Sequence, residues 1–311
     1  MLAYKKLFDD IFEEVGKVIV GQEEMVTQLL SAILADGNAL LEGYPGLAKT
    51  LTVRTLAKVM DLRFSRIQNT PDLMPSDITG TYVLEENNGK REFKFHPGPI
   101  FANIVLADEI NRATPKTQSA LLEAMQEKQV TAGNTTYKLD LPFFVLATQN
   151  PIEQEGTYKL PEAQEDRFML KIKVTYPTFD EEMEIVNRYA GEDRERKTKI
   201  VISRDQLLDL QALTRQVPIS SDLKQFVVKL IAETRLRKEI IEYGASPRAS
   251  TGLVLASKAR ALVSGRNHVS MEDIRAMAYP VLRHRIILNF EAERKGLTPD
   301  GAIKMLLDKI K

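Results

Sequence analysis

One eight-residue segment constrains the fold of this chain more than any other part of the sequence. It follows the pattern Gly-x-x-x-x-Gly-Lys-Thr with one departure, and its members are Gly43, Tyr44, Pro45, Gly46, Leu47, Ala48, Lys49 and Thr50. An apolar run, 39–41, precedes it, and a helix-forming run from Leu51 to Met60 follows. A strand, a glycine loop and a helix that begins at Lys-Thr can bind a nucleoside triphosphate, because backbone N–H groups and the helix N-terminus surround the phosphates.

Particular residues of this loop have expected tasks. Lys49 would reach the β and γ phosphates, the Thr50 hydroxyl would hold Mg²⁺, and the contact surface would extend to Leu51. Ala48 stands where the pattern has its second glycine. We expect alanine to be tolerated there because the position opens the helix. The alternative is a chance turn before a helix.

Composition narrows the protein class. The chain has 311 residues, enough for two domains, and its 43 basic residues balance its 43 acidic residues, so bulk charge would not recruit DNA or a membrane. It has no cysteine, which excludes disulfides and thiolate zinc sites, and its three histidines are scattered. The apolar runs are too short to span a bilayer, and the N-terminus is typical of an amphipathic helix. We expect a soluble cytoplasmic protein.

The secondary-structure pattern changes near residue 177. Before that point strands alternate with helices, which favours an α/β fold with a parallel sheet, and two hairpins are predicted around Asn87-Asn88-Gly89 and Gly133-Asn134. From Asp180 onward the pattern is helical. We therefore expect an α/β nucleotide-binding domain with two inserted hairpins over 1–177 and an all-helical domain over 178–311.

Two further strands end in polar side chains suited to phosphate chemistry. Asp108 closes the apolar strand 104–108, so its carboxylate should emerge beside the Mg²⁺ held by Thr50, and Glu109 would polarise the attacking water. Asn150 ends another apolar strand and could orient that water. The alternatives are a solvated turn for the two acids and an Asx turn before Pro151 for the asparagine.

Several phrases in order resemble an AAA+ ATPase, and more narrowly the MoxR family, in the branch that carries an insert in its second helix and is related to magnesium chelatase motor subunits. The phrases are Val20-Gly21-Gln22, Gly43 to Thr50, Thr70 to Asp77, Asp108 to Ala113, Asn150-Pro151-Ile152-Glu153, Glu165-Asp166-Arg167-Phe168 and Ser246-Pro247-Arg248. They cover nearly the whole chain, and they are specific when taken together.

The resemblance implies a three-layer αβα domain followed by a helical lid, with ATP and Mg²⁺ as ligands. It places Val20, Gly21 and Gln22 against adenine, although an ordinary helix N-terminus would also explain them. It makes Asn150 the first sensor, on a strand between the phosphate-loop strand and the Asp108 strand, and lets Asp108 hold Mg²⁺ through water. It also lets Gln68 restrain the catalytic glutamate.

The resemblance also assigns two arginines to catalysis. Arg167 would be an arginine finger that points into a neighbouring subunit's site; the alternative is a surface ion pair with Asp166 or Glu165. Arg248 would be the second sensor, acting on its own or an adjacent nucleotide. Arg112 also matches a family position, to which no role is assigned, and a structural salt bridge would explain it equally well. The basic run 283–285 is expected on a solvated or interdomain face.

The implied function is ATP hydrolysis by a hexameric ring that remodels or matures a partner protein complex, including insertion of metal or cofactor, together with a partner that carries a von Willebrand A domain. The hairpins would face the pore and present charge to the client, or would simply be solvated; the residues concerned are Lys90, Arg91, Lys94, His96 and Lys138. The alternative is a nucleic-acid motor, against which the zero net charge counts. A binding module without turnover and a small GTPase fit the sequence less well.

Overall fold

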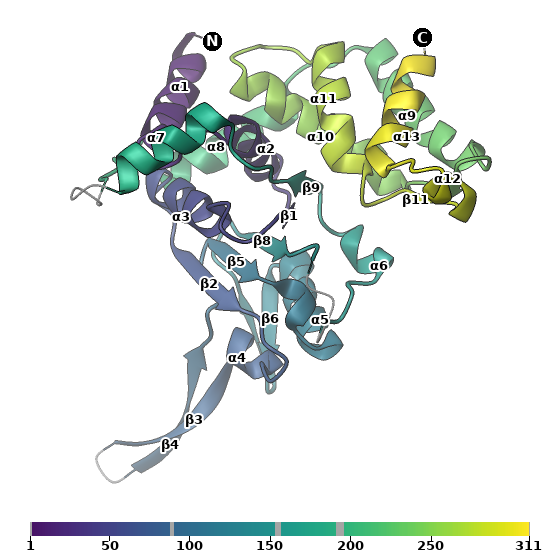
Figure 1. Ribbon diagram of the computed structural model, residues 1–311. Coiled ribbons are helices and arrows are strands. Elements are labelled where there is room, and N and C mark those ends of the chain that lie inside the picture. Colours follow the sequence, from purple (N-terminus) through teal and green to yellow (C-terminus); the bar gives the residue numbers. More distant parts are fainter. Residues whose placement is uncertain (1, 88–89, 153–156, 191–195, 311) are drawn as a thin grey trace.

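A five-stranded parallel sheet forms the centre of the N-terminal region in the computed structural model, which describes residues 2–87, 90–152, 157–190 and 196–310. The sheet order is β2-β5-β8-β1-β9 (Figure 1). The strands are β1 Ala39–Glu42, β2 Phe64–Gln68, β5 Ile104–Asp108, β8 Phe144–Gln149 and β9 Leu170–Lys173. The expected α/β architecture is confirmed, and β8 lies between β5 and β1 as the resemblance implied.

Alternating side chains of these strands enter two separate cores. Ile104 and Leu106 pack with helices on one face, whereas Val105 and Ala107 pack with helices on the other. The first face is covered by α1 Leu2–Gly16, α2 Glu23–Leu34 and α3 Lys49–Val59, and the second by α4 Pro75–Thr79 and α5 Pro115–Glu127. Burial on both faces explains why the central strands are continuously apolar, and it gives the expected three layers.

Both predicted hairpins are present, although Asn88 and Gly89 of the first turn lie outside the described residues. The first, β3 Gly80–Asn87 with β4 Lys90–Pro97, projects from the body (Figure 1), and the second is β6 Gln129–Ala132 with β7 Thr135–Lys138. An aromatic cluster joins their bases. The Tyr82 and Tyr137 hydroxyls are 2.8 Å apart, and the Phe95 ring stacks on Tyr137 with centroids 4.2 Å apart.

The C-terminal region is helical, as expected, apart from one small ladder. Its helices are α7 Phe179–Tyr189, α8 Arg204–Gln216, α9 Ser221–Leu236, α10 Pro247–Val263, α11 Met271–Leu282, α12 Phe290–Arg294 and α13 Pro299–Lys309. The ladder pairs β10 Ile241–Tyr243 with β11 Ile287–Leu288. Strands of two or three residues are too short to show alternation in a sequence. Two further short helices, η1 Ile110–Arg112 and α6 Glu162–Glu165, flank the functional region of the sheet.

The lid helices are docked on the α/β region through a buried contact. Helix α10 packs against α2, and α11 packs against β9. The His284 ring contacts the Phe168 carbonyl, while Arg283 and Arg285 donate to the carbonyls of Lys171 and Met169. The basic run therefore lies on an interdomain face, and the solvated alternative is wrong. None of the helices in the described part of the chain is long and apolar enough to cross a membrane.

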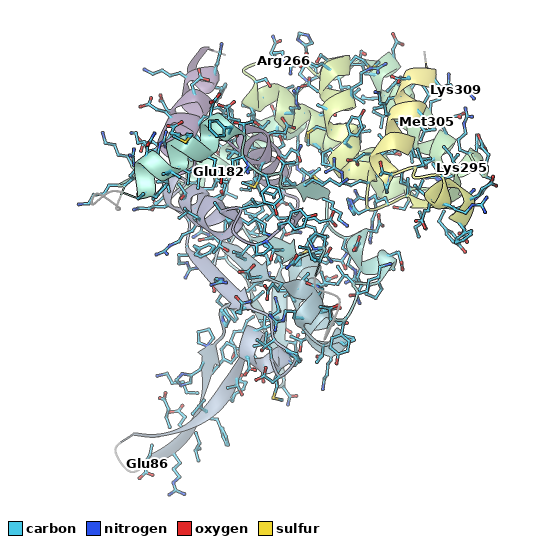
Figure 2. All side chains as sticks on the ribbon, viewed as in Figure 1. Glu86, Glu182, Arg266, Lys295, Met305 and Lys309 are labelled. Atoms are coloured by element: carbon cyan, nitrogen blue, oxygen red, sulfur yellow. The ribbon has the colours of Figure 1, made fainter. Side chains whose placement is uncertain are left out.

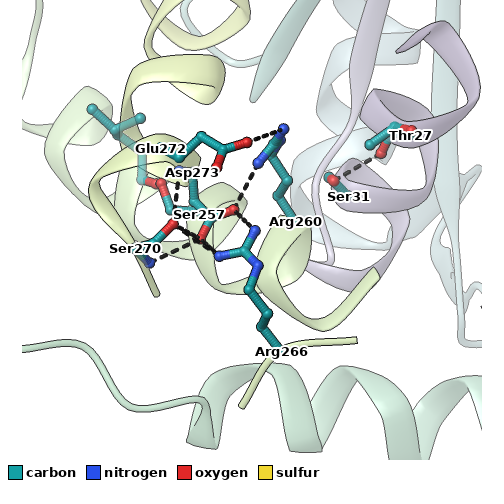
Figure 3. A network of polar contacts seen from close by, with 9 residues as sticks. Thr27, Ser31, Ser257, Arg260, Arg266, Ser270, Glu272 and Asp273 are labelled. Carbon is teal, nitrogen blue, oxygen red and sulfur yellow. Dashed lines mark hydrogen bonds and ion pairs between the residues drawn. The ribbon is translucent and has the colours of Figure 1, made fainter. Parts of the chain in front are cut away.

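A buried carboxylate joins the two central lid helices. Asp273, at the start of α11, is fully buried and accepts hydrogen bonds from Arg260, Arg266 and the Ser270 hydroxyl (Figure 3). The Arg260 bond is 2.8 Å long. Burial disfavours the charge of Asp273, but the bonds from Arg266, Ser270 and Arg260 together outweigh it and hold the pKa below its ordinary value.

Replacing Asp273 with alanine should destabilise the lid. Two arginines would lose their shared acceptor, and breaking a buried pair costs about 3 kcal/mol or more. Urea unfolding of Asp273→Ala measures the loss. Glu272→Ala is the matched control, because Glu272 is 79% exposed and lies 3.6 Å from Arg260. We expect the control to cost less than about 1 kcal/mol; equal losses would contradict the role of Asp273.

The stability difference between the wild type and Asp273→Ala should depend on pH in one direction. Because the folded pKa of Asp273 is lowered, its contribution is complete above the ordinary value of 3.8 and is lost as the pH falls through the folded pKa. Unfolding measured from pH 7 down into this acidic range should show the two proteins converging. A difference that grows with acid would contradict this assignment.

Candidate functional site

The phosphate loop joins β1 to α3 and contains two left-handed residues. Gly46 has φ +83° and Ala48, directly before the helix, has φ +56°. The expectation that alanine sits at ease there is therefore wrong. The position needs the conformation that glycine adopts freely, and a left-handed alanine costs roughly 1–2 kcal/mol. The loop adopts this conformation despite the unfavourable backbone energy at Ala48.

Lys49 lies inside the loop that it is expected to serve. Its Nζ donates to the carbonyls of Gly43 and Tyr44, the latter at 3.1 Å. Burial lowers the pKa of Lys49, while the nearby Asp108 and Glu109 carboxylates oppose that shift. A half-buried ammonium bound to neutral carbonyls can exchange them for phosphate oxygens.

The Asp108 carboxylate lies at the centre of the site, at the end of β5. Its Oδ1 accepts from the Thr148 hydroxyl at 2.6 Å, and its Oδ2 accepts from Arg66 Nε at 2.9 Å and Nη2 at 2.6 Å. The Thr50 hydroxyl is 3.5 Å from the same Oδ2. The two residues expected at Mg²⁺ are thus brought together.

Glu109 is held by its backbone and by its side chain. It has φ +53°, an unusual backbone conformation for a residue other than glycine, and its N–H donates to Thr148 Oγ1 at 2.8 Å. Its Oε2 accepts from Gln68 Nε2 at 3.1 Å and from Arg112 Nη1 at 3.0 Å. The proposed restraint by Gln68 and the salt bridge of Arg112 both appear as contacts, and they argue against a freely solvated turn.

Asn150 has both features considered for it. Its Oδ1 accepts from the Ile152 N–H at 3.2 Å, which is an Asx turn, and the residue also lines the phosphate pocket. Within the described ranges, the Asn150 amide nitrogen donates no hydrogen bond. A turn that fixes Oδ1 also fixes where that nitrogen can point.

These groups surround one pocket of about 410 Å³. Its lining is Pro45, Gly46, Leu47, Ala48, Lys49, Thr50, Leu51, Arg66, Asp108, Glu109, Thr148 and Asn150. No group of three or more His, Cys, Asp or Glu within the described ranges could hold a metal alone. The Thr50 hydroxyl and the Asp108 carboxylate nevertheless fit Mg²⁺, which is usually bound by one or two protein oxygens together with substrate phosphates.

The segment expected at adenine lines a separate pocket. Val20 and Gly21 border a cavity of about 230 Å³ between α1, α2 and α7. Gln22 occupies the N-cap position of α2 without a side-chain capping bond, and its Nε2 donates to the Thr175 carbonyl at 2.8 Å. The next residue, Tyr176, stacks on Tyr44 of the phosphate loop with centroids 5.2 Å apart. This chain of contacts joins the two pockets.

Arg167 and Arg248 do not line the phosphate pocket of their own chain. Both border a third cavity of about 460 Å³, formed by the end of α6 and the start of α10. Arg248 is 3.7 Å from Asp166 and 59% exposed. No ion pair involves Arg167 in the part of the chain that the structure describes, because Asp166 binds Arg285, Arg248 and Ser246 instead.

Sequence reasoning missed Arg66 and Thr148, which both bind Asp108. The alternation of side chains along a strand could have predicted both of them. Arg66 stands two residues before Gln68 on β2, and Thr148 stands two before Asn150 on β8, so each should share a face with a residue already singled out.

Comparison with known proteins identifies the family. Residues 38–170 match the ATPase family associated with various cellular activities, and residues 233–304 match the AAA lid domain. The chain is 44% identical to Chaperone MoxR1 of Mycobacterium tuberculosis, over 96% of this chain and 80% of the relative. It is 32% identical to Protein MoxR of Methylorubrum extorquens, over 92% and 90%. A crystal structure of a Cytophaga hutchinsonii protein matches with a TM-score of 0.93 and 48% identity, over 100% and 96%. The sequence phrases, the αβα sheet with its lid and these relatives agree: the chain belongs to the MoxR family of AAA+ ATPases.

Proposed function

We propose that this ATPase works as a ring in which MgATP binds the 410 Å³ pocket and hydrolysis drives remodelling of a partner protein complex. The observation that carries the proposal is the convergence of Lys49, Thr50, Asp108, Glu109 and Asn150 on that pocket. Lys49 and Thr50 open α3, Asp108 and Glu109 lie at the end of β5, and Asn150 directly follows β8. Three segments that are far apart in the sequence therefore contribute to one pocket.

Each group has a task in phosphoryl transfer. The loop N–H groups and Lys49 bind the phosphates, and Thr50 and Asp108 would hold Mg²⁺, which would neutralise charge on the phosphate oxygens. Glu109 accepts the proton of the attacking water, and the Asn150 amide orients that water. The Gln68 and Arg112 contacts fix Glu109 until substrate arrives.

The position of the two arginines supports a shared site. Arg167 and Arg248 border a cavity with no residue in common with the phosphate pocket. A second copy can bring this cavity to the phosphate pocket of the first, so that the site is completed in a ring, which we take to be a hexamer. The positive charge of these arginines would then stabilise the charge of the transition state.

We also propose that the ATPase acts on a protein client together with a partner protein that carries a von Willebrand A domain. The outcome would be maturation of an enzyme complex, including metal or cofactor insertion. The name of the relative Chaperone MoxR1 supports the chaperone part. The projecting hairpin supplies a place for contact, with Glu86 near its tip (Figure 2). A cytoplasmic location stays a prediction from the sequence.

The nucleic-acid alternative finds little support in the hairpin charges. Arg91 pairs with Glu86 at 3.3 Å, and Glu85 accepts from Lys94 at 3.3 Å and contacts His96 at 2.7 Å. The Lys90 side chain lies outside the described residues. Paired cations offer less to a phosphate backbone than free ones do. An unwinding assay with a forked duplex would test this alternative directly.

Two substitutions separate nucleotide binding from hydrolysis. Lys49→Ala should abolish ATP binding, because it removes the cation of the loop, whereas Glu109→Gln should bind ATP normally and lose at least about 100-fold in turnover. Calorimetric binding and phosphate release measure the two effects. Lys58→Ala, from the exposed side of the same helix, is the control and should retain both. Wild-type turnover in Glu109→Gln would exclude Glu109 as the base.

Mixed rings test whether sites are shared. Arg167→Ala should bind ATP but lose roughly 10³-fold or more in turnover, as expected for an arginine finger. Adding Lys49→Ala subunits, which bind no ATP but retain Arg167, should restore part of the activity. The exposed lid residue Arg275 provides the control substitution, Arg275→Ala, which should leave turnover unchanged. If mixing restores nothing, the arginine does not act across subunits.

A further inference from the structure

One side chain of the phosphate pocket has no part in the function proposed above. Arg66 projects from β2, one of the two edge strands of the five-stranded sheet, and both its Nε and its Nη2 donate to Asp108 Oδ2. The same guanidinium donates to Gln68 Oε1 at 2.5 Å. Two acceptors therefore fix its position, although the side chain is 48% exposed.

The Oδ2 atom bound by Arg66 is the one on the side of Thr50. The Thr50 hydroxyl lies 3.5 Å from Oδ2, whereas Oδ1 is occupied by the Thr148 hydroxyl. A Mg²⁺ ion held between Thr50 and Asp108, directly or through water, approaches the carboxylate from this side. A guanidinium 2.6 Å from Oδ2 excludes a hydrated cation there, and the two positive charges repel.

Electrostatics explains why a cation is needed at this place. Asp108 and Glu109 border a pocket that receives phosphates, and uncompensated carboxylates would repel them. Lys49 donates to loop carbonyls and not to Asp108, so Arg66 is the one cationic side chain in contact with that carboxylate among the residues that the structure describes. Arginine suits the position because its planar group can bind Asp108 and Gln68 together.

Building on the function proposed above, we propose that Arg66 is an internal substitute for the metal ion. It neutralises Asp108 before nucleotide arrives, and its guanidinium would have to leave Oδ2 when the metal–nucleotide complex binds. Arg66 is thus a positioning residue that sets how strongly nucleotide binding depends on Mg²⁺, and it keeps the pocket open to nucleotide without metal.

The test compares ADP binding by calorimetry in EDTA and in excess Mg²⁺. ADP is used because it is not hydrolysed. In Arg66→Gln, metal-free binding should weaken because Asp108 is no longer neutralised, and Mg²⁺-supported binding should stay equal or become tighter because no side chain competes. The ratio of the metal-free Kd to the Mg²⁺ Kd should rise by roughly five- to thirtyfold, as expected for the loss of one charge-assisted, partly exposed pair.

Two further variants serve as controls. Arg63 directly precedes the same strand and pairs with Asp140 on the surface. In Arg63→Gln the ratio of the metal-free Kd to the Mg²⁺ Kd should equal that of the wild type. Arg66→Lys keeps the charge and should recover part of the metal-free affinity.

The possible outcomes are distinct. If Arg66→Gln weakens binding equally in both conditions, Arg66 has only a structural or direct phosphate-binding role, and the inference is overturned while the proposed ATPase site stands. If the wild-type chain binds no ADP in either condition, the proposed function fails, and the inference fails with it.

Discussion

The hydrogen bonds that pair β5, β8 and β1 in parallel are the constraint on which the site depends. Parallel strands end at one edge of a sheet, so residues at 42–50, 108–109 and 148–150 meet there although they are far apart in the chain. Thr148 shows how tightly this edge is organised, since its hydroxyl contacts both the Asp108 carboxylate and the Glu109 N–H. A shift of one residue in the pairing would turn these side chains toward the opposite face of the sheet and away from one another.

Much of this arrangement could be predicted from the sequence, because it depends on strong local patterns. The apolar strands, the glycine loop and the Asn-Gly hairpin each have a physical signature over a few residues, and each element is found. The site residues Lys49, Thr50, Asp108, Glu109 and Asn150 converge for the same reason. What local patterns do not show is conformation at a single residue: Ala48 was expected to be relaxed and is left-handed.

Contacts between segments that are far apart in the sequence could not be predicted from local patterns. Arg66 and Asp108 pair across two strands, and the run 283–285 is buried against carbonyls more than a hundred residues away. Charged residues in a sequence usually predict an exposed position. Their burial follows only from the carbonyl and carboxylate groups that bind them in the folded chain. Asp166 is the clearest case, because three lid residues, Ser246, Arg248 and Arg285, bind a carboxylate that stands beside Arg167. The lid is thus tied to the segment proposed to reach a neighbouring site.

The aromatic cluster between the hairpins has a structural consequence. Tyr82 on the long hairpin is bonded to Tyr137 on the short one, and the chain runs from Tyr137 through Phe143 directly into β8, the strand that ends beside Asn150. The aromatic cluster therefore connects the projecting hairpin, through residues 137–143, to the strand whose end borders the phosphate pocket.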